Sequence, residues 1–281
     1  MEIFAAAALY ALLSLGLNII VGFAGLLHLG YAALFAIGAY TYALLNLRVG
    51  CPFWVSLPVS GLSAGLAGVL LGLPAIRVRG DYLAIVTLGS GEIVRIVFTN
   101  LEGWTGGPNG LMGIAHPALG SYHFGVDSTP YYLFLVFLVA ATAWACSKLR
   151  RSRMGLAWRA VKEDELAATC LGIDATRMKL LALGLGGWVA GLAGCVFAAK
   201  QGTITPDSFD FILSVMILAM VILGGLGSVA GAIVGAAVLS AAPELLRDFA
   251  SYRMLLFGML MILLMRVRPQ GLFGQCSRLN G

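Results

Sequence analysis

Long apolar segments constrain the fold of this 281-residue chain more than any other feature of its sequence. Nine of them lie at about residues 3–22, 27–47, 53–76, 82–99, 131–147, 180–199, 210–226, 229–246 and 253–267. Several approach the roughly 20 residues that a helix needs to cross a bilayer. Charged residues make up 11% of the chain, whereas soluble domains carry about 25%. Because the segments are continuously apolar and do not alternate with polar residues, we expect an all-α, polytopic transmembrane helical bundle with about 8–10 spans.

The distribution of Lys and Arg predicts how the bundle is oriented. Cytoplasmic loops of membrane proteins are enriched in these residues, and none occurs between Ile96 and Ser147. We therefore expect an external loop at about 100–130 and a cytoplasmic loop at about 148–179, within a single membrane domain that covers residues 1–281. The same rule assigns five other arginines to the cytoplasmic side: Arg77, Arg79, Arg266, Arg268 and Arg278. Nine crossings then place the N-terminus outside and the C-terminus inside. The Gly-rich stretches 27–47 and 210–246 leave re-entrant segments open.

The predicted cytoplasmic loop is the longest polar stretch of the chain. It holds eight of the eighteen Lys and Arg residues and four of the thirteen acids. Met154, Trp158 and Val161 recur at helical spacing and predict a short helix with an apolar stripe. The charged residues of this helix lie away from the stripe: Arg159, Lys162 and Glu163.

Three further residues of the same loop predict helix ends. Asp164 is suited to cap a second short helix, and Gly172 to follow it in the left-handed conformation. Asp174 is suited to cap the next span. The expected arrangement is a rigid helix, corner and helix at the cytoplasmic surface. A basic amphipathic loop can lie on anionic lipid, but the interspersed acids favour the docking of a soluble protein.

Three of the polar residues inside predicted spans, Asn18, Glu92 and Arg95, are candidates for a role in helix packing or in a solute path. Asn18 precedes glycines at positions 22 and 25, which predicts a helix break that serves either close helix packing or the lining of a pathway. Glu92 and Arg95 lie one helical turn apart, where a charge at the bilayer centre costs at least about 2.5 kcal/mol. Their spacing allows an ion pair. We interpret it either as a buried pair that fixes helix register or as a polar point on a substrate or gating path.

Glycines at short, regular spacing predict close contact between helix backbones. They occur as Gly61, Gly65, Gly68 and Gly72, as Gly187 and Gly191, and as Gly227, Gly231 and Gly235. We expect these glycines to pack within the bundle or against a second subunit.

The predicted external loop contains a turn-forming sequence: Thr105, Gly106, Gly107, Pro108, Asn109 and Gly110. Gly, Pro and Asn-Gly favour tight turns, so this stretch predicts an ordered surface that an external partner could recognise. His116 and His123 are isolated from each other and from every Cys, and we expect no metal site there.

The chain has no GxxxxGK[ST] motif, so it lacks the P-loop route to ATP binding and needs a partner as its energy source. An ion-coupled carrier would need intramembrane carboxylates, and only Glu92 clearly qualifies, with Glu244 near a helix end. An integral membrane enzyme would need a cluster of catalytic side chains, whereas the three histidines are not clustered with acids in the sequence. The sequence thus favours neither alternative.

Four stretches resemble the inner-membrane permease subunits of bacterial ABC importers for branched-chain amino acids, the LivH/LivM type and within it LivM. They are GFAGLLHLGYAALFAIGAY at 22–40, RGDYLAIVTLGSGEIVR at 79–95, TGGPNGL at 105–111 and GLAWRAVKEDELAATCLG at 155–172. The resemblance implies that the last stretch docks into a groove on a cytoplasmic ATPase. The residues that it implicates in this coupling are Arg153, Gly155, Trp158, Arg159, Glu163, Asp164, Glu165, Ala167, Ala168 and Gly172.

The resemblance also implies partners, location and solute. The partners would be a second permease subunit, either a copy or a different LivH-like chain, two cytoplasmic ABC ATPases that use ATP-Mg, and a periplasmic solute-binding protein. The chain itself would bind no cofactor, would have no enzymatic activity and would cross the bacterial inner (plasma) membrane several times. The implied solutes are branched-chain or related hydrophobic amino acids, with urea, amides or another small solute as the alternative.

Overall fold

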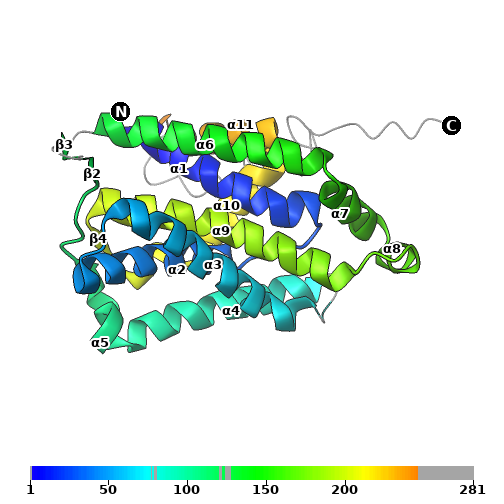
Figure 1. Ribbon diagram of the computed structural model, residues 1–281, viewed down its shortest axis with the longest axis horizontal. Helices are drawn as coiled ribbons and strands as arrows, with labels where there is room; N and C mark the ends of the chain where they lie inside the picture. Colours follow the sequence, from blue (N-terminus) through cyan, green and yellow to red (C-terminus); the bar gives the residue numbers. More distant parts are fainter. Residues whose placement is uncertain (1, 77, 79–80, 120–121, 124–127, 246–281) are drawn as a thin grey trace.

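Seven helices are long and apolar enough to cross a membrane in the part of the chain that the computed structural model describes, residues 2–76, 78, 81–119, 122–123 and 128–245. They are α1 (Glu2–Leu17) with the π-helix η1 (Asn18–Phe23), α2 (Tyr31–Leu44) with the π-helix η2 (Leu45–Val49), α3 (Phe53–Ile76), α4 (Asp81–Asn100), α6 (Ser128–Arg151), α9 (Ala175–Gln201), and α10 (Phe211–Gly224) with the 3-10 helix η4 (Pro206–Phe209). They run roughly along one axis in a single bundle (Figure 1). The predicted helical membrane bundle is confirmed.

Short elements gather at the two ends of the bundle (Figure 1). One end carries α5 (Glu102–Thr105), the 3-10 helix η3 (Gly107–Asn109), β1 (Leu111–Met112), β2 (Ala118–Leu119), β3 (Tyr122–His123) and β4 (Thr203–Ile204). Strand β1 pairs antiparallel with β4, and β2 pairs antiparallel with β3. The other end carries α7 (Arg153–Glu163) and α8 (Glu165–Cys170). Since α1 begins at the first end, the start of the chain and α7–α8 lie on opposite sides of the bundle.

The two Gly-rich stretches contain regular helices. Residues 31–49 and 206–224 each form a membrane-length span of 19 residues. Helix α11 (Val229–Leu245) follows a turn at 225–228 and is shorter, at 17 residues. The ninth predicted segment at 253–267 and the five other arginines assigned to the cytoplasmic side lie outside the described residues.

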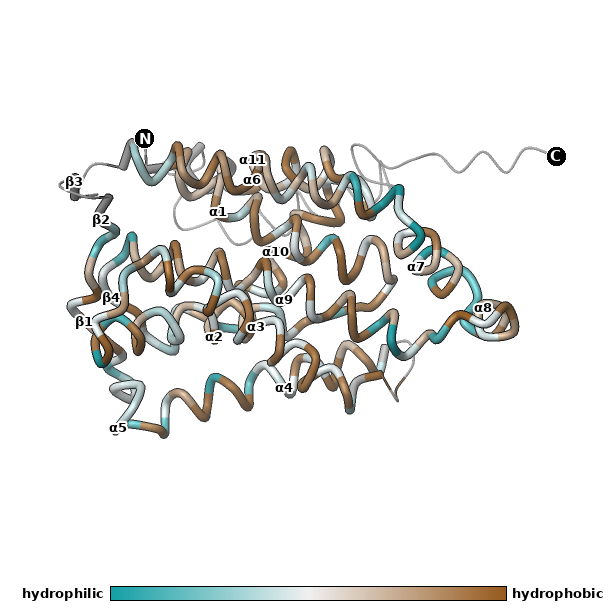
Figure 2. Tube along the Cα trace, viewed as in Figure 1, coloured by the Kyte–Doolittle hydropathy of each residue, from teal (hydrophilic) through white to brown (hydrophobic). Residues whose placement is uncertain are grey.

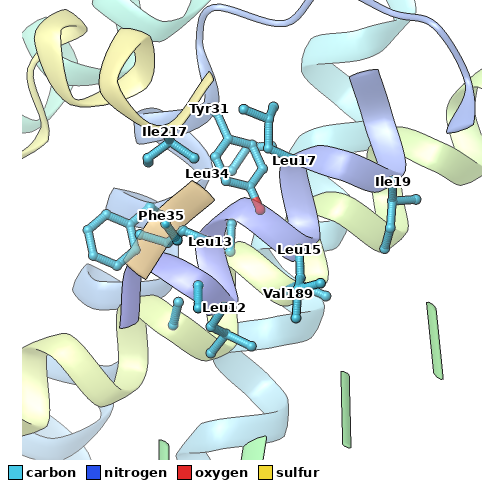
Figure 3. Packing of buried hydrophobic residues seen from close by; sticks show 14 of the residues in the cluster. Leu12, Leu13, Leu15, Leu17, Ile19, Tyr31, Leu34, Phe35, Val189 and Ile217 are labelled. Carbon is cyan, nitrogen blue, oxygen red and sulfur yellow. The ribbon is translucent and has the colours of Figure 1, made fainter. Parts of the chain in front are cut away.

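The core of the bundle is built around α1 (Figure 3). Leu12, Leu13, Leu15 and Leu17 of α1 are all fully buried, because neighbouring helices cover this helix on every side. A helix that is apolar all round needs such surroundings in a bundle or in lipid. The Tyr31 hydroxyl enters the same core and donates a hydrogen bond of 3.1 Å to the carbonyl oxygen of Gly186, so its polar end is satisfied.

The predicted glycine contacts join α3 to α9. A Cβ atom added at Gly191 would lie 2.2 Å from the carbonyl oxygen of Ser60 and 2.9 Å from Cα of Gly61. One added at Gly187 would lie 2.7 Å from the carbonyl oxygen of Ala64. The two backbones approach closely because these positions have no side chain, so the glycines pack within the bundle.

The expected helix break after Asn18 is present. The chain passes from α1 into η1 and then runs without regular helix through residues 24–30. Side chains of other helices accept hydrogen bonds from the backbone on either side of the α2 start: Thr87 from the amide of Leu29 at 3.1 Å, and Ser214 from that of Ala32 at 2.9 Å. Buried backbone outside a helix needs partners of this kind.

Candidate functional site

The α7–α8 element, residues 153–170 at one end of the bundle, has the helix ends that the sequence predicts. The Asp164 carboxylate caps α8 by accepting from the amides of Leu166 and Ala167 at 2.9 and 3.0 Å. Asp174 caps α9 by accepting from the amide of Arg177 at 3.0 Å. Gly172 has a positive φ of 84° in the turn between α8 and α9. Asp164 thus fixes the corner between α7 and α8, and Gly172 and Asp174 fix the turn from α8 into α9.

The inner face of α7 is anchored to the bundle through Trp158. Its side chain is fully buried, and the indole Nε1 donates to the carbonyl oxygen of Met178 at 2.7 Å. The ring stacks on Phe23 of η1, with centroids 6.5 Å apart. Gly155 has no room for a side chain, because a Cβ there would lie 2.4 Å from the carbonyl oxygen of Leu149. The predicted apolar stripe therefore fastens α7 to α6, α9 and η1.

Two ionic side chains add contacts that the sequence did not predict. Lys179 of α9 pairs with Glu165 of α8, Nζ to Oε1 at 2.7 Å, with side-chain exposures of 9% and 28%. Lys162 turns toward the bundle and donates to the carbonyl oxygen of Gly22 at 2.9 Å. Burial of the ammonium lowers the pKa of Lys162 from its usual value, and the neighbouring Glu163 carboxylate acts in the opposite direction. Both lysines thus connect the α7–α8 element to membrane helices.

The outer face of the α7–α8 element mixes charges with exposed leucines. Six of the ten residues implicated in coupling are exposed: Arg153, Arg159, Glu163, Asp164, Ala167 and Gly172. Glu165 is half-buried, and Gly155, Trp158 and Ala168 are buried. This face also exposes three large apolar residues that were not predicted from the sequence: Leu156, Leu166 and Leu171. The sequence does indicate Leu156, because its position does not match the Met154–Trp158–Val161 stripe and places it on the opposite side of α7. Figure 2 shows hydrophilic and hydrophobic stretches alternating along α7 and α8.

A cleft of about 720 Å³ separates α7 from the ends of the membrane helices. Its lining comes from η1, α6, α7 and the turn between α10 and α11: Gly22, Phe23, Arg150, Gly155, Arg159, Lys162, Glu163, Leu226, Gly227 and Ser228. Arg150 crosses to this turn and donates to the carbonyl oxygen of Gly227 at 3.3 Å. The cleft thus lies where α7 meets the ends of η1 and α6 and the turn between α10 and α11.

Asn18 lies next to this junction and joins η1 to the α10–α11 turn. Its Oδ1 accepts from the amide of Gly227 at 2.9 Å, and its Nδ2 donates to the carbonyl oxygen of Ser228 at 3.3 Å. The side chain is buried, and both ends of the amide are used. Of the two interpretations of Asn18, this geometry favours helix packing.

Glu92 and Arg95 form the predicted pair on α4, with Nε of Arg95 2.9 Å from Oε1 of Glu92. The pair is not buried, since the side chains of Arg95 and Glu92 remain 33% and 39% exposed. A third member, Asp207, was not predicted from the sequence: Nη1 of Arg95 also contacts Oδ1 of Asp207 at 3.2 Å, and Asp207 is 82% exposed. The expectation of a buried pair is wrong within this chain, because α4 lies at the edge of the bundle (Figure 1).

The turn sequence at 105–110 is held by local hydrogen bonds. The Thr105 hydroxyl donates to the carbonyl oxygen of Phe98 at 2.6 Å and accepts from the amide of Gly107 at 3.4 Å. Gly106, Gly107 and Gly110 all have positive φ, and Pro108 and Asn109 belong to η3. The turn packs so closely on β4 that a Cβ at Gly110 would lie 1.9 Å from the carbonyl oxygen of Ile204.

His116 has a structural environment. Its Nδ1 lies 3.0 Å from the Tyr131 hydroxyl and 2.9 Å from the carbonyl oxygen of Ala199. The His123 side chain falls outside the described residues. Among the residues that the structure describes, no three His, Cys, Asp or Glu side chains come together as metal ligands would.

Comparison with known proteins identifies relatives along almost the whole chain. Residues 1–265 match the family described as the branched-chain amino acid transport system permease component. The high-affinity branched-chain amino acid transport system permease protein LivM of Salmonella typhimurium is 47% identical over 94% of this chain and 67% of its own length. LivM of Escherichia coli is 46% identical over the same shares.

A second group of relatives is more distant. The permease protein LivH of Salmonella typhimurium is 26% identical over 95% of this chain and 91% of its own length. No solved structure matches the chain. The match to LivM and the family match over residues 1–265 show that this chain belongs to the branched-chain amino acid transport permease family.

Proposed function

We propose that this chain is a permease subunit of an ABC importer that moves branched-chain or related hydrophobic amino acids across the bacterial inner membrane into the cytoplasm. Two cytoplasmic ATPases would bind and hydrolyse MgATP, and the chain itself would hold no cofactor. A second, LivH-like permease and a periplasmic solute-binding protein complete the proposed complex. The relatives named LivM and LivH support the pairing of two different permeases.

The observation that carries the proposal is the double-sided α7–α8 element. Its inner face is fixed to α9 and η1 through Trp158, Glu165 and Lys162. Its outer face exposes leucines within a ring of mixed charge, the composition of a protein-docking patch rather than of a lipid-facing helix. A partner that grips the outer face and moves would therefore pull on several membrane helices together.

The proposed orientation places α7–α8 in the cytoplasm. The chain begins at the opposite end of the bundle, so the N-terminus and the 105–110 turn would face the periplasm (Figure 1). The excess of Lys and Arg at 148–179 supports this orientation. In this scheme, ATP-driven closure of the ATPases displaces α7–α8, and the helices rock between outward-facing and inward-facing states.

The docking step is tested with Leu166→Glu in the assembled complex. This substitution places a charge on the exposed outer face of α8 while leaving the caps and the inner face intact. We expect ATPase affinity to fall by about tenfold or more, as for loss of an apolar anchor in an interface. Leu101→Glu is the matched control, because Leu101 is also exposed but lies at the other end of the bundle. Unchanged ATPase association in Leu166→Glu would contradict the docking assignment.

The solute is tested in proteoliposomes with the purified complex. Uptake of radiolabelled leucine that requires ATP and the solute-loaded binding protein is expected. Uptake of urea or an amide under the same conditions, with none of leucine, would support the alternative solute class. Uptake driven by an ion gradient without ATP would refute the proposed energy source.

A further inference from the structure

Helix α4 is poorly covered by the other helices of the chain, yet it carries ionic side chains. Within its apolar window only 11% of the residues are buried inside this chain, against 67% for α1 and α9. Helix α6 is almost as uncovered, at 17%, but it carries no charged residue between its start and Lys148. The exposed side chains of α6, such as Leu133 and Phe137, suit contact with lipid. The exposed surface of α4, by contrast, includes Glu92 and Arg95 and is poorly suited to contact with lipid.

The depth of Glu92 rules out an ordinary interfacial position, whereas Arg95 lies about one turn nearer the end of α4. Glu92 is the twelfth of the 20 residues of α4, so at 1.5 Å per residue it lies about 12 Å from the nearer helix end. A helix of this length spans about the thickness of the hydrocarbon layer. Ionic groups at such depth face the interior of a bundle or a water-filled cavity. Within this chain the side chains of Arg95 and Glu92 are 33% and 39% exposed, so water or a polar partner must cover them.

The exposed side of the pair opens on a groove between α4 and the start of α10. Glu92, Leu88, Asp210 and Ser214 line a water-sized cavity of about 10 Å³ in this groove. Its floor is narrow, since a Cβ at Gly91 would lie 2.9 Å from Cα of Gly30. Asp207 of η4 is not part of this lining but is linked to it, because its carboxylate contacts Arg95, the partner of Glu92. Three carboxylates and one guanidinium thus lie at the groove or are linked to it, and these side chains alone leave two negative charges unbalanced. Asp210 also caps α10, where it accepts from the amide of Leu213 at 2.9 Å.

We propose that this α4–α10 groove is the wall that the chain contributes to the solute path, with the second permease subunit closing the opposite side. The inference rests on the proposed function and assigns to the groove the charged ends of an amino-acid zwitterion. The guanidinium of Arg95 binds the solute carboxylate when its ion pair with the exposed Asp207 breaks. The freed Asp207 carboxylate, with Glu92 and Asp210, receives the ammonium. Charge-assisted hydrogen bonds of both kinds are strong where bulk water is excluded.

The ion pairs of the groove suit weak, reversible binding of the solute. Arg95 is the only bridge between Glu92 on α4 and Asp207 in η4 among the ion pairs of the described residues. A solute that replaces Asp207 at Arg95 exchanges one carboxylate for another, so entry adds no net charge and gives the displaced Asp207 carboxylate an ammonium partner. Binding that exchanges equivalent contacts holds the solute weakly and allows it to leave.

Thiol accessibility tests whether the groove is aqueous. Single cysteines replace Leu88 in the groove and Phe137 on α6, in a variant with the native cysteines replaced, within the complete complex in liposomes. A charged, membrane-impermeant methanethiosulfonate reacts with thiolates in water. We expect Leu88→Cys to react at least about tenfold faster than Phe137→Cys, since lipid excludes both the reagent and thiolate formation. Leucine with ATP and binding protein should slow the reaction at Leu88→Cys. Equal, slow reaction at both positions would overturn the proposal.

A second variant tests the charges. Asp207→Asn removes an exposed carboxylate at little structural cost, whereas Glu102→Gln removes a charge from α5 outside the groove. We expect Asp207→Asn to lower leucine uptake per ATP hydrolysed severalfold and Glu102→Gln to leave it unchanged. Identical uptake in the two variants would also overturn the proposal. The labelling contrast requires no uptake, so a complex that labels as expected but transports no amino acid would count against the proposed function and not against an aqueous groove.

Discussion

The indole N–H of Trp158 donates to the carbonyl oxygen of Met178 across 2.7 Å, and this hydrogen bond joins the middle of α7 to the first turns of α9. The two residues are 20 positions apart, with the whole of α8 between them. Because Trp158 also stacks on Phe23, the same side chain connects the α7–α8 element to the end of the first span. A force applied at the surface therefore reaches two membrane helices through one residue.

Trp158→Phe separates the hydrogen bond from the packing of this side chain. The phenyl ring keeps most of the apolar contact, so we expect a loss of about 1 kcal/mol in the free energy of unfolding, the net value of one hydrogen bond. Trp158→Ala should cost about 3–5 kcal/mol, because it also leaves a cavity. Denaturant unfolding in detergent, followed by tryptophan-independent probes, measures both. Trp144→Phe on α6 is the control, since Trp144 is exposed. Equal losses at the two positions would show that Trp158 does not anchor α7.

The Glu165–Lys179 pair is expected to behave as a coupled unit. Removing either partner alone leaves the other charge partly buried. The losses of unfolding free energy in Lys179→Met and Glu165→Gln should therefore add up to more than the loss in the double variant. A double-mutant cycle should give a coupling of about 1–3 kcal/mol. The exposed pair of Arg177 and Asp174, at 2.9 Å, should give about 0.3–0.5 kcal/mol in a parallel cycle. A coupling no larger than that of the exposed pair would mean that this contact does not hold α8.

Local and long-range features differ in how far the sequence could predict them. Asp164, Gly172 and Asp174 were predictable as helix ends, because each acts on backbone groups within a few residues. The apolar stripe on α7 was predictable for the same reason, since its period alone identifies the buried face. The pairing of Glu92 with Arg95 follows from their spacing of three residues on one helix.

The missed contacts depend on the arrangement of helices. Asp207 lies 112 positions from Arg95, and nothing in either local sequence marks them as neighbours. Lys162 lies on the polar side of α7 by periodicity, yet the end of η1 comes near enough to accept from its ammonium. Whether the Glu92–Arg95 pair is covered depends on the position of α4 in the bundle, which hydrophobicity alone does not specify. These features required the three-dimensional packing.

The turn at Gly110 should tolerate no side chain. Gly110 and Gly113 both have positive φ, 70° and 78°, so alanine is strained at either position by about 1–2 kcal/mol. Only Gly110 faces backbone, with the added Cβ 1.9 Å from the carbonyl oxygen of Ile204, whereas nothing lies within 4 Å at Gly113. Gly110→Ala should therefore lower the unfolding temperature more than Gly113→Ala and reduce stimulation of the ATPases by the binding protein. If both variants lower the unfolding temperature equally, backbone strain alone, and not the contact with Ile204, accounts for the loss of stability.

Asn18→Leu tests whether the α10–α11 turn is held by the Asn18 amide. The substitution keeps the branching and the number of non-hydrogen atoms of the side chain but leaves the amide of Gly227 and the carbonyl of Ser228 without their present partner. Each unsatisfied buried group costs about 1–3 kcal/mol, so the variant should be among the least stable that still insert. Asn100→Leu provides the matched control, because Asn100 is exposed and its amide bonds only to its own helix. Hydrogen exchange at 225–228 should rise in Asn18→Leu and stay unchanged in Asn100→Leu. Unchanged exchange in both would assign the stability of the turn to the packing of α10 on α11 and leave Asn18 available for a role on the solute path.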